Sequence, residues 1–301
     1  PLDSFGIWMI GPALLKYGSE ALKQQHLPPI VRGEIRWCQG YSEPGAGSDL
    51  AGLQTRAIDH GDHYIVNGQK IWTSYANKAD WCFCLVRTDP DAKKQLGISL
   101  VLFDMATPGV ETRPIKLISG ASPFCETFLT DVRVEKSQLV GEENKGWTYA
   151  KYLLTHEREM ISGMGRTASG DKALWELVAD ATGMDADGRL DDPMLRTDVA
   201  RWDLDAMAFA LTSERINAEA KAGQGVGAAS AMLKYYGTEL NKRRYELAIA
   251  AEGADAMVWE GQAHKGGALP RAWLRTKANS IEGGTTEVQL NIISKNILGL
   301  G

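Results

Sequence analysis

The chain has 301 residues, of which 44% are hydrophobic and 24% charged, and its formal net charge is −5. This length suits two or three domains, and the composition is that of a globular protein. The acidic balance argues against a nucleic-acid partner, because no basic excess is present to displace counterions from phosphates. No apolar run approaches the roughly 20 residues that span a bilayer, so no membrane span is expected.

The cysteines and histidines do not predict a metal site. The four cysteines, Cys38, Cys82, Cys84 and Cys125, have no zinc-type spacing, and the five histidines are scattered. We therefore interpret the cysteines as small apolar residues of a protein in a reducing compartment.

The first 36 residues are expected to be helical. Apolar residues from Ile7 to Leu15 share one face of a first helix. Ser19 is the expected N-cap of a second helix, and Pro28-Pro29 is expected to end it.

Between residues 37 and 140 the apolar pattern has period two, which is typical of strands. Asn67-Gly68 predicts a tight hairpin between strands at 64–66 and 69–74. Further strands are expected at 81–86, 98–103 and 126–134. Short strands without intervening helices favour an antiparallel barrel or sandwich over a Rossmann sheet.

From Gly146 onward the pattern is helical again. Long helices are expected from Gly146, from Pro193, over 228–251 and over 287–297, which together predict a bundle. The expected fold is therefore α+β and multidomain. Its parts are a helical segment (1–36), a central antiparallel β domain (37–142) and a C-terminal four-helix bundle (143–301).

The loop Tyr41-Ser-Glu-Pro-Gly-Ala-Gly-Ser-Asp49 is the most conspicuous local pattern. Pro44-Gly45 predicts a turn, and the small residues let the backbone approach a ligand closely. Such a loop offers N–H groups and hydroxyls to a phosphate or a polar ring. An ordinary surface turn with polar caps is the alternative interpretation.

Four stretches in order resemble one family. They are the loop 41–49, Asn-Gly-Gln-Lys-Ile-Trp-Thr-Ser (67–74), Val-Gly-Glu-Glu-Asn-Lys-Gly-Trp (140–147) and Gly-Gly-Thr-Thr-Glu-Val-Gln (283–289). In this order they resemble the acyl-CoA dehydrogenases, whose helix–β–helix organisation agrees with the expected fold. That family has a longer N-terminal helical domain, most of which is expected to be absent from this sequence.

The resemblance implies a reaction and its partners. Members remove hydrogen from C2 and C3 of an acyl-CoA thioester in fatty-acid β-oxidation, leaving a trans-2-enoyl-CoA. A carboxylate takes the C2 proton, and N5 of FAD takes the hydride. The implied electron acceptor is an electron-transferring flavoprotein, and the implied assembly is a homo- or heterotetramer. The implied location is the cytoplasm, or the mitochondrial matrix in a eukaryote.

The resemblance also assigns residues to the cofactor. Ser42 is expected on the pyrimidine side of the flavin, Trp72 beside the ring, and the Ser74 hydroxyl at N5. The full set of residues expected to bind FAD is Gln39, Tyr41, Ser42, Trp72, Thr73, Ser74, Thr285 and Glu287. For Thr285 the alternative is a plain helix N-cap.

The catalytic base is less direct to assign. Many members carry it immediately before the Gly-Thr of the last motif, where this chain has Gly283, assigned here only to the substrate site. Other members carry it on the first bundle helix as Glu-Arg, which matches Glu157 as the base and Arg158 as a contact to CoA. Glu282 is the rival base. Ser48 matches the position that contacts the thioester or pantetheine arm.

Two departures from the family weaken the case for a self-sufficient homotetramer. The usual Arg-x-x-Phe-Gly run and the usual Gly-Gly-x-Gly loop are both missing, so a related second subunit is expected to complete the FAD site. Two alternatives remain open. One is a flavoenzyme of the same fold with other chemistry, such as an oxidase or a desulfinase. The other is a non-catalytic subunit of a heterotetramer.

Overall fold

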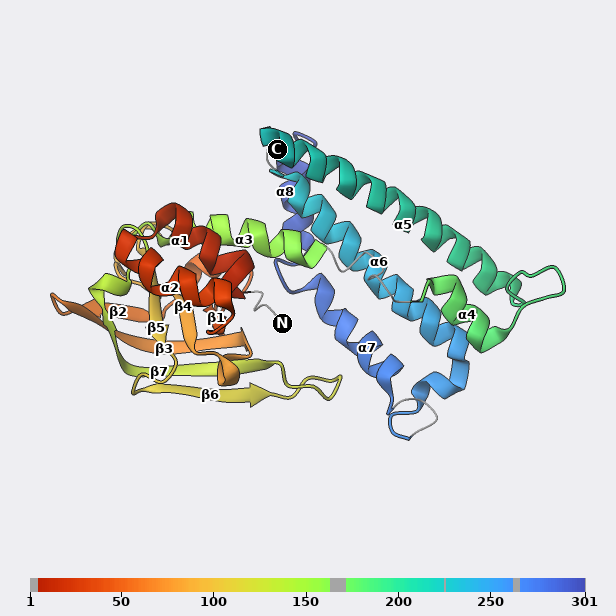
Figure 1. The fold of residues 1–301 in the computed structure, drawn as a ribbon, viewed down its shortest axis with the longest axis horizontal. Helices are drawn as coiled ribbons and strands as arrows, with labels where there is room; N and C mark the ends of the chain where they lie inside the picture. Colours follow the sequence, from red (N-terminus) through yellow and green to blue (C-terminus); the bar gives the residue numbers. More distant parts are fainter. Residues whose placement is uncertain (1–4, 163–171, 225, 262–265, 301) are drawn as a thin grey trace. The chain divides into compact units, whose positions relative to one another are not determined.

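The structure is a computed structural model that describes residues 5–162, 172–224, 226–261 and 266–300 (Figure 1). The side chains at 156–162 and 224 lie outside the described part. Contacts divide the chain into two units. Unit 1 comprises Pro1–Lys116 and Ala121–Glu157, and unit 2 comprises Leu117–Gly120 and Arg158–Gly301. Among the described residues, no helix is both long and apolar enough to cross a membrane.

Unit 1 begins with helices, as predicted. A π-helical turn (Phe5–Ile10) leads into α1 (Gly11–Tyr17), and α2 (Glu20–Arg32) follows. The expected N-cap is confirmed, because the Ser19 hydroxyl accepts a hydrogen bond from the Leu22 N–H at 3.3 Å.

The predicted end of α2 at Pro28-Pro29 is wrong, because the helix continues through both prolines to Arg32. The φ angle of proline is compatible with a helix, and the burial of Ile30 (3% exposed) against the core helps to offset the lost hydrogen bonds. The helix ends instead at Gly33, whose φ of 67° is a typical left-handed C-terminal conformation.

Seven strands form one sheet in the order β1-β4-β2-β3-β7-β6, with β5 paired to β4. The strands are β1 (Trp37–Gly40), β2 (Arg56–Asp59), β3 (His63–Ser74), β4 (Trp81–Arg87), β5 (Ile98–Asp104), β6 (Val110–Ile115) and β7 (Phe124–Glu135). The pairs β2/β3, β3/β7, β4/β5 and β6/β7 are antiparallel, as expected. The pairs β1/β4 and β2/β4 are parallel. The sequence pattern did not predict strands β1, β2 and β6.

The predicted hairpin at Asn67-Gly68 is wrong, because β3 runs straight through these two residues. The Asn67 side chain instead pairs with Asp131 of β7: its amide donates to Asp131 Oδ1 at 3.0 Å, and its carbonyl accepts the Asp131 N–H at 2.9 Å. Asp131 has a φ of 51° and lies at a register shift. Gly68 is needed for close packing, because an added Cβ would lie 2.4 Å from the Thr55 hydroxyl.

Unit 1 has two hydrophobic cores, and helices α1, α2 and α3 (Gly146–Ser162) lie on one side of the sheet (Figure 1). One core joins the N-terminal helices and the first part of α3 to residues of β1, β4 and β5, such as Trp37, Phe83 and Leu100. The other core lies between strands and includes all four cysteines, which are free and buried. The interpretation of the cysteines as buried apolar residues is therefore confirmed.

The rest of unit 2 is helical: α4 (Leu174–Thr182), α5 (Pro193–Glu219), α6 (Ala229–Glu252), α7 (Ala268–Thr276) and α8 (Thr286–Asn296). The long helices were predicted, whereas α4 and α7 were not. A core of α4, α5 and α6 includes Trp202, whose indole N–H donates to the Leu240 carbonyl at 2.9 Å.

A short segment of the β6–β7 connection, Leu117–Gly120, belongs to the helical unit. Arg271 holds it, since Nη1 of its guanidinium donates to the Ser119 carbonyl at 3.1 Å. The same guanidinium lies 3.9 Å from the ring centroid of Trp259. Neither unit is therefore a single continuous stretch of chain. The boundaries 1–36, 37–142 and 143–301 remain a prediction about domains.

Candidate active site

The first motif forms a tight turn that lies beside β3. Glu43 and Ala46 exchange two main-chain hydrogen bonds of 3.0 Å across Pro44-Gly45. The preceding residue is tied to the second motif, because the Ile71 N–H donates to the Ser42 carbonyl at 2.9 Å. Two motifs separated along the chain are thus adjacent within unit 1.

A buried ion pair fixes this arrangement. Lys70 Nζ lies 2.8 Å from Glu43 Oε1 and donates to the Tyr41 carbonyl at 3.2 Å. The side chains of Lys70 and Glu43 are only 1% and 7% exposed. The Glu43 carboxylate also accepts the main-chain N–H groups of Gln54 at 2.6 Å and Thr55 at 2.9 Å.

The pKa of Glu43 reflects opposing influences. Burial raises the pKa, but the charge of Lys70 and the hydrogen bonds from Lys70, Thr55 and Gln54 outweigh burial. The net result is a pKa below the ordinary carboxyl value, so Glu43 is ionised at neutral pH. We therefore regard this carboxylate as a clamp on the loop rather than as a proton acceptor.

Trp72 has the most unusual conformation in the second motif. Between Lys70 and Thr73 the register with β7 shifts, which places one extra residue in β3. At this bulge Trp72 has a φ of 60°, which is rare for a bulky residue, and its side chain is 51% exposed. A strained conformation of this kind costs free energy and persists only where the surrounding fold holds it in place. Such residues cluster at active sites and ligand sites.

The other predicted flavin residues of unit 1 differ in accessibility. Ser42 and Ser74 are partly exposed, and neither hydroxyl bonds to another residue in the described part of the chain. Gln39 is partly exposed on β1, whereas Tyr41 is buried with its ring 5.9 Å from Phe83. Thr73 is fully buried, so its hydroxyl faces the protein interior.

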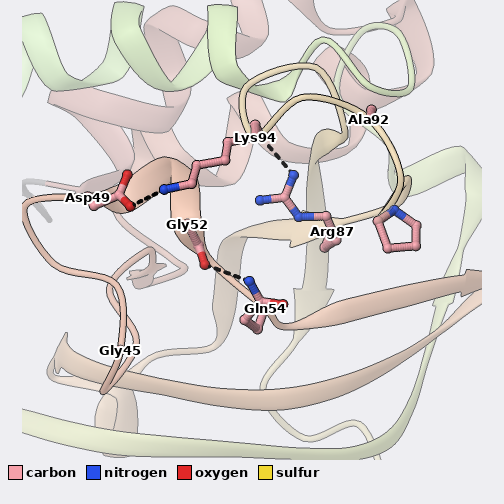
Figure 2. A pocket seen from close by; sticks show the side chains of 8 residues that line it. Gly45, Asp49, Gly52, Gln54, Arg87, Ala92 and Lys94 are labelled. Carbon is pink, nitrogen blue, oxygen red and sulfur yellow. Dashed lines mark hydrogen bonds and ion pairs between the residues drawn. The ribbon is translucent and has the colours of Figure 1, made fainter.

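Next to Ser48, an open pocket of about 260 Å³ lies in unit 1 (Figure 2). Its lining residues are Gly45, Asp49, Gly52, Gln54, Arg87, Pro90, Ala92 and Lys94. Lys94 and Asp49 form an exposed ion pair of 2.6 Å at its rim. Ser48 itself is exposed.

Arg87 is the buried cation of this pocket. Its guanidinium donates to the carbonyls of Ala51 at 2.6 Å and Leu53 at 3.1 Å. It also donates to the carbonyl of Lys94 at 2.7 Å (Figure 2). Desolvation lowers the pKa of Arg87 from its ordinary value. No carboxylate among the described side chains lies within ion-pair distance of it, whereas Asp49 of the same lining pairs with Lys94. Arg87 therefore gives the pocket lining a net positive charge.

The predicted base and its neighbour lie on helix α3, at positions 157 and 158. The side chains of Glu157 and Arg158 are outside the described residues. Their roles therefore remain predictions from the sequence.

The last motif lies in unit 2 and begins α8. The Thr285 hydroxyl accepts the Val288 N–H at 3.3 Å, which makes it the N-cap of this helix. Main-chain and Thr285 hydrogen bonds lower the pKa of exposed Glu287 from its ordinary value. Gly283 and Gly284 precede the cap with φ angles of 63° and 92°, in the region that favours glycine.

Glu282, the rival base, is already engaged within unit 2. Its two carboxylate oxygens accept Arg275 Nη1 at 3.2 Å and Nη2 at 2.8 Å. Asn279 Nδ2 donates to the same carboxylate at 2.6 Å. A base would have to be released from these three donors before it could accept a proton.

In unit 1 the structure thus places Ser42 beside β3, the strand that carries Trp72 and Ser74. In unit 2 it places Gly283 before the N-cap Thr285 of α8, whose first turn carries Glu287. Sequence reasoning missed Glu43, Lys70 and Arg87 as organising residues. The sequence did contain a sign that Lys70 is buried. It is a charged residue that falls on the inward-facing positions of the alternating pattern of β3.

Two family profiles match the chain. The one described as "Acyl-CoA dehydrogenase, middle domain" matches residues 38–132, and "Acyl-CoA dehydrogenase, C-terminal domain" matches residues 144–298. Acyl-CoA dehydrogenase FadE34 of Mycobacterium tuberculosis is 37% identical over 97% of this chain, which spans 39% of that protein. Acyl-CoA dehydrogenase IpdE1 of the same organism is 36% identical over 99% of this chain, which spans 76% of that protein.

Solved structures agree with these matches. The Tcur3481-Tcur3483 steroid ACAD is 33% identical with a TM-score of 0.89, covering 99% of this chain and 76% of that chain. The ChsE4-ChsE5 complex from Mycobacterium tuberculosis is 33% identical with a TM-score of 0.82, covering 100% of this chain and 78% of that chain.

Proposed function

Because the chain belongs to the acyl-CoA dehydrogenase family, an oxidoreductase family of flavoproteins, we propose that it oxidises an acyl-CoA thioester to the trans-2-enoyl-CoA with FAD bound. The observation that carries the proposal is Trp72, a strained and half-exposed indole at a bulge of β3 beside the Ser42 main chain. An aromatic side chain held in this way is available to flank a flat ring.

The residues of unit 1 fit a flavin. Trp72 offers a face to the ring. The hydroxyls of Ser42 and Ser74 bond to no other residue among those described, so they can donate to the polar edge of the ring. We assign Thr285 and Glu287 to the ribityl, phosphate or adenine parts of FAD. Gln39 and Tyr41 are assigned to FAD binding as residues at the start of the loop that contains Ser42. Thr73, being buried, contributes by supporting the bulge. When bound, FAD supplies the hydride acceptor.

We propose that Glu157 takes the proton from C2 of the thioester. A carboxylate must lie within hydrogen-bond reach of this weakly acidic proton. Gly283 offers no side chain for the task, and Arg275 and Asn279 occupy Glu282. Glu157 on α3 therefore remains the preferred base, with Arg158 as a contact to CoA.

For the substrate, we assign Ser48 to the thioester or pantetheine arm and the neighbouring pocket to the phosphate-bearing end of CoA. The positive charge that Arg87 gives to this lining suits phosphate oxygens. For the acyl group we propose a bulky ring-bearing chain. This rests on the relative described as a steroid ACAD.

The decisive experiment compares Glu157→Gln with Glu159→Gln on the same helix. We expect both proteins to be yellow with bound FAD. A panel of acyl-CoAs that includes ring-bearing ones should bleach the flavin of Glu159→Gln but not that of Glu157→Gln. Bleaching by Glu157→Gln, together with its loss in Glu282→Gln, would show that Glu282 is the base.

A non-catalytic subunit of a mixed complex is the second candidate. It is favoured by Gly283 at the position where many members carry a base, and by a matched structure that is named as the ChsE4-ChsE5 complex. Co-expression with a related chain distinguishes the candidates. If the complex bleaches equally well with wild-type chain and with Glu157→Gln, the chemistry belongs to the other subunit.

A further inference from the structure

The loop before α8 has almost no conformational preference of its own. Gly283 and Gly284 are adjacent, and both have left-handed φ angles of 63° and 92°. Glycine populates many backbone conformations and loses the most freedom on ordering. The shape of this loop must therefore be imposed by side chains from elsewhere in unit 2.

Lys234 of α6 supplies that constraint. Its side chain is completely buried, and its ammonium donates to the Asn279 carbonyl at 3.0 Å and to the Gly284 carbonyl at 2.8 Å. Asn279 lies in the 3-10 turn Lys277–Ser280, and Gly284 precedes the N-cap Thr285. One charged group thus ties both ends of the linker between that turn and α8.

Gln289 of α8 closes the loop from the other side. Its amide Nε2 donates to the carbonyls of Gly283 at 3.1 Å and Gly284 at 3.3 Å, and the residue is fully buried. A Cβ added to Gly284 would lie 2.4 Å from this nitrogen, so the amide needs a glycine there. The Gly284 carbonyl therefore receives two buried donors, one of them charged.

We propose that Lys234 is a positioning residue that fixes the Gly283–Thr285 loop, and through it the ligand contacts of the last motif. The identity of those ligands rests on the proposed function, but the positioning itself does not. A buried lysine costs desolvation, which its hydrogen bonds must offset. Removing it takes this donor from the carbonyls of buried Asn279 and partly buried Gly284, and it removes a constraint on the two glycines.

The test compares Lys234→Met with Lys242→Met in the intact protein. Lys242 lies on the same helix, pairs with Glu239 at 2.8 Å and donates to the Ser280 hydroxyl, but within the described part of the chain it makes no hydrogen bond to the glycine loop. Hydrogen–deuterium exchange is measured by peptide. In Lys234→Met we expect the amides of residues 281–286 to exchange at least about tenfold faster, because the loop loses the hydrogen bonds of a charged donor and opens more often. Lys242→Met should leave them unchanged.

Unchanged exchange at 281–286 in Lys234→Met would overturn the proposal, as would equal acceleration throughout 172–300. If Lys234→Met does not fold, Gln289→Met is measured instead. We expect a smaller acceleration of amide exchange at residues 281–286 in this variant, and no acceleration there would refute the proposal. FAD affinity is the second measurement, expected to fall in Lys234→Met and to recover in part in Lys234→Arg. A wild-type protein that never binds FAD would refute the proposed function and leave the exchange result decisive for Lys234.

Discussion

Breaking the buried Lys70–Glu43 pair should cost far more than breaking a surface pair. In Lys70→Met the apolar stem is retained, but the 2.8 Å contact to Glu43 is lost and a carboxylate only 7% exposed keeps its charge. Removing one partner of a buried pair typically costs ~3–5 kcal/mol. Because Glu43 keeps the main-chain donors of Gln54 and Thr55, we expect about 3 kcal/mol, the lower end of that range.

Thermal unfolding followed by circular dichroism measures this cost. A loss of about 3 kcal/mol corresponds to a fall in Tm of about 6–12 °C for a unit of this size. The control is Lys94→Met, which breaks an ion pair whose side chains are 60% and 63% exposed. Such a surface pair is worth roughly 0–1 kcal/mol. The double variant Glu43→Gln, Lys70→Met should recover part of the loss, because no charge is left buried.

The pH dependence gives an independent check. In the wild type the pKa of Glu43 is lowered, so its contribution to stability is present above the ordinary value of 4.5 and is lost at lower pH. In Lys70→Met burial is no longer opposed by the charge of Lys70, so the pKa of Glu43 should rise. The Tm difference between variant and wild type should therefore shrink from pH 7 to pH 5. A Lys70→Met protein as stable as Lys94→Met, with a pH-independent difference, would refute the reasoning.

Three further predictions concern other parts of the chain. Gly146→Ala should cost roughly 1–3 kcal/mol in chemical denaturation, because its new Cβ would lie 2.6 Å from the Ser99 carbonyl carbon. Burial lowers the pKa of His26 although its ring Nε2 donates a hydrogen bond to Gln138 Oε1, which favours the charged form. Wild-type stability should therefore fall as pH drops below 6.5, and melting curves of His26→Leu should not show this loss. Trp72→Ala should weaken FAD binding by roughly 1–2 kcal/mol in fluorescence titration while leaving Tm nearly unchanged, since the side chain is half exposed.

The sequence predicted the order of helices and strands well where the apolar period was long. The predictions were wrong where a short residue pair is compatible with two different local structures. Asn67-Gly68 has the composition of a hairpin turn, but the partner that uses the Asn67 side chain is Asp131, far along the chain. Pro28-Pro29 has the composition of a helix end, but burial of Ile30 favours continuing the helix. Tertiary contacts decided both cases.

For the site, the motifs located the loop and the strand but not what holds them together. The bulge that turns Trp72 outward depends on register with β7, and register is a pairing between strands that one strand does not encode alone. The roles of Lys70 and Lys234 depend likewise on carbonyls that only folding brings close. The available signal in the sequence was that Lys70 and Lys234 are charged residues at positions where the apolar pattern predicts burial.

The assignment of Leu117–Gly120 to the helical unit has a consequence for how the chain can be cut. The backbone passes between the two units at three points, after Lys116, after Gly120 and after Glu157. A protease that cleaves after Lys116 would leave β7 in the second fragment, still paired to β3 of the first. We expect the nicked fragments to copurify as one particle. Neither unit can be moved to another protein as one uninterrupted segment of gene, so the two units are expected to be inherited together.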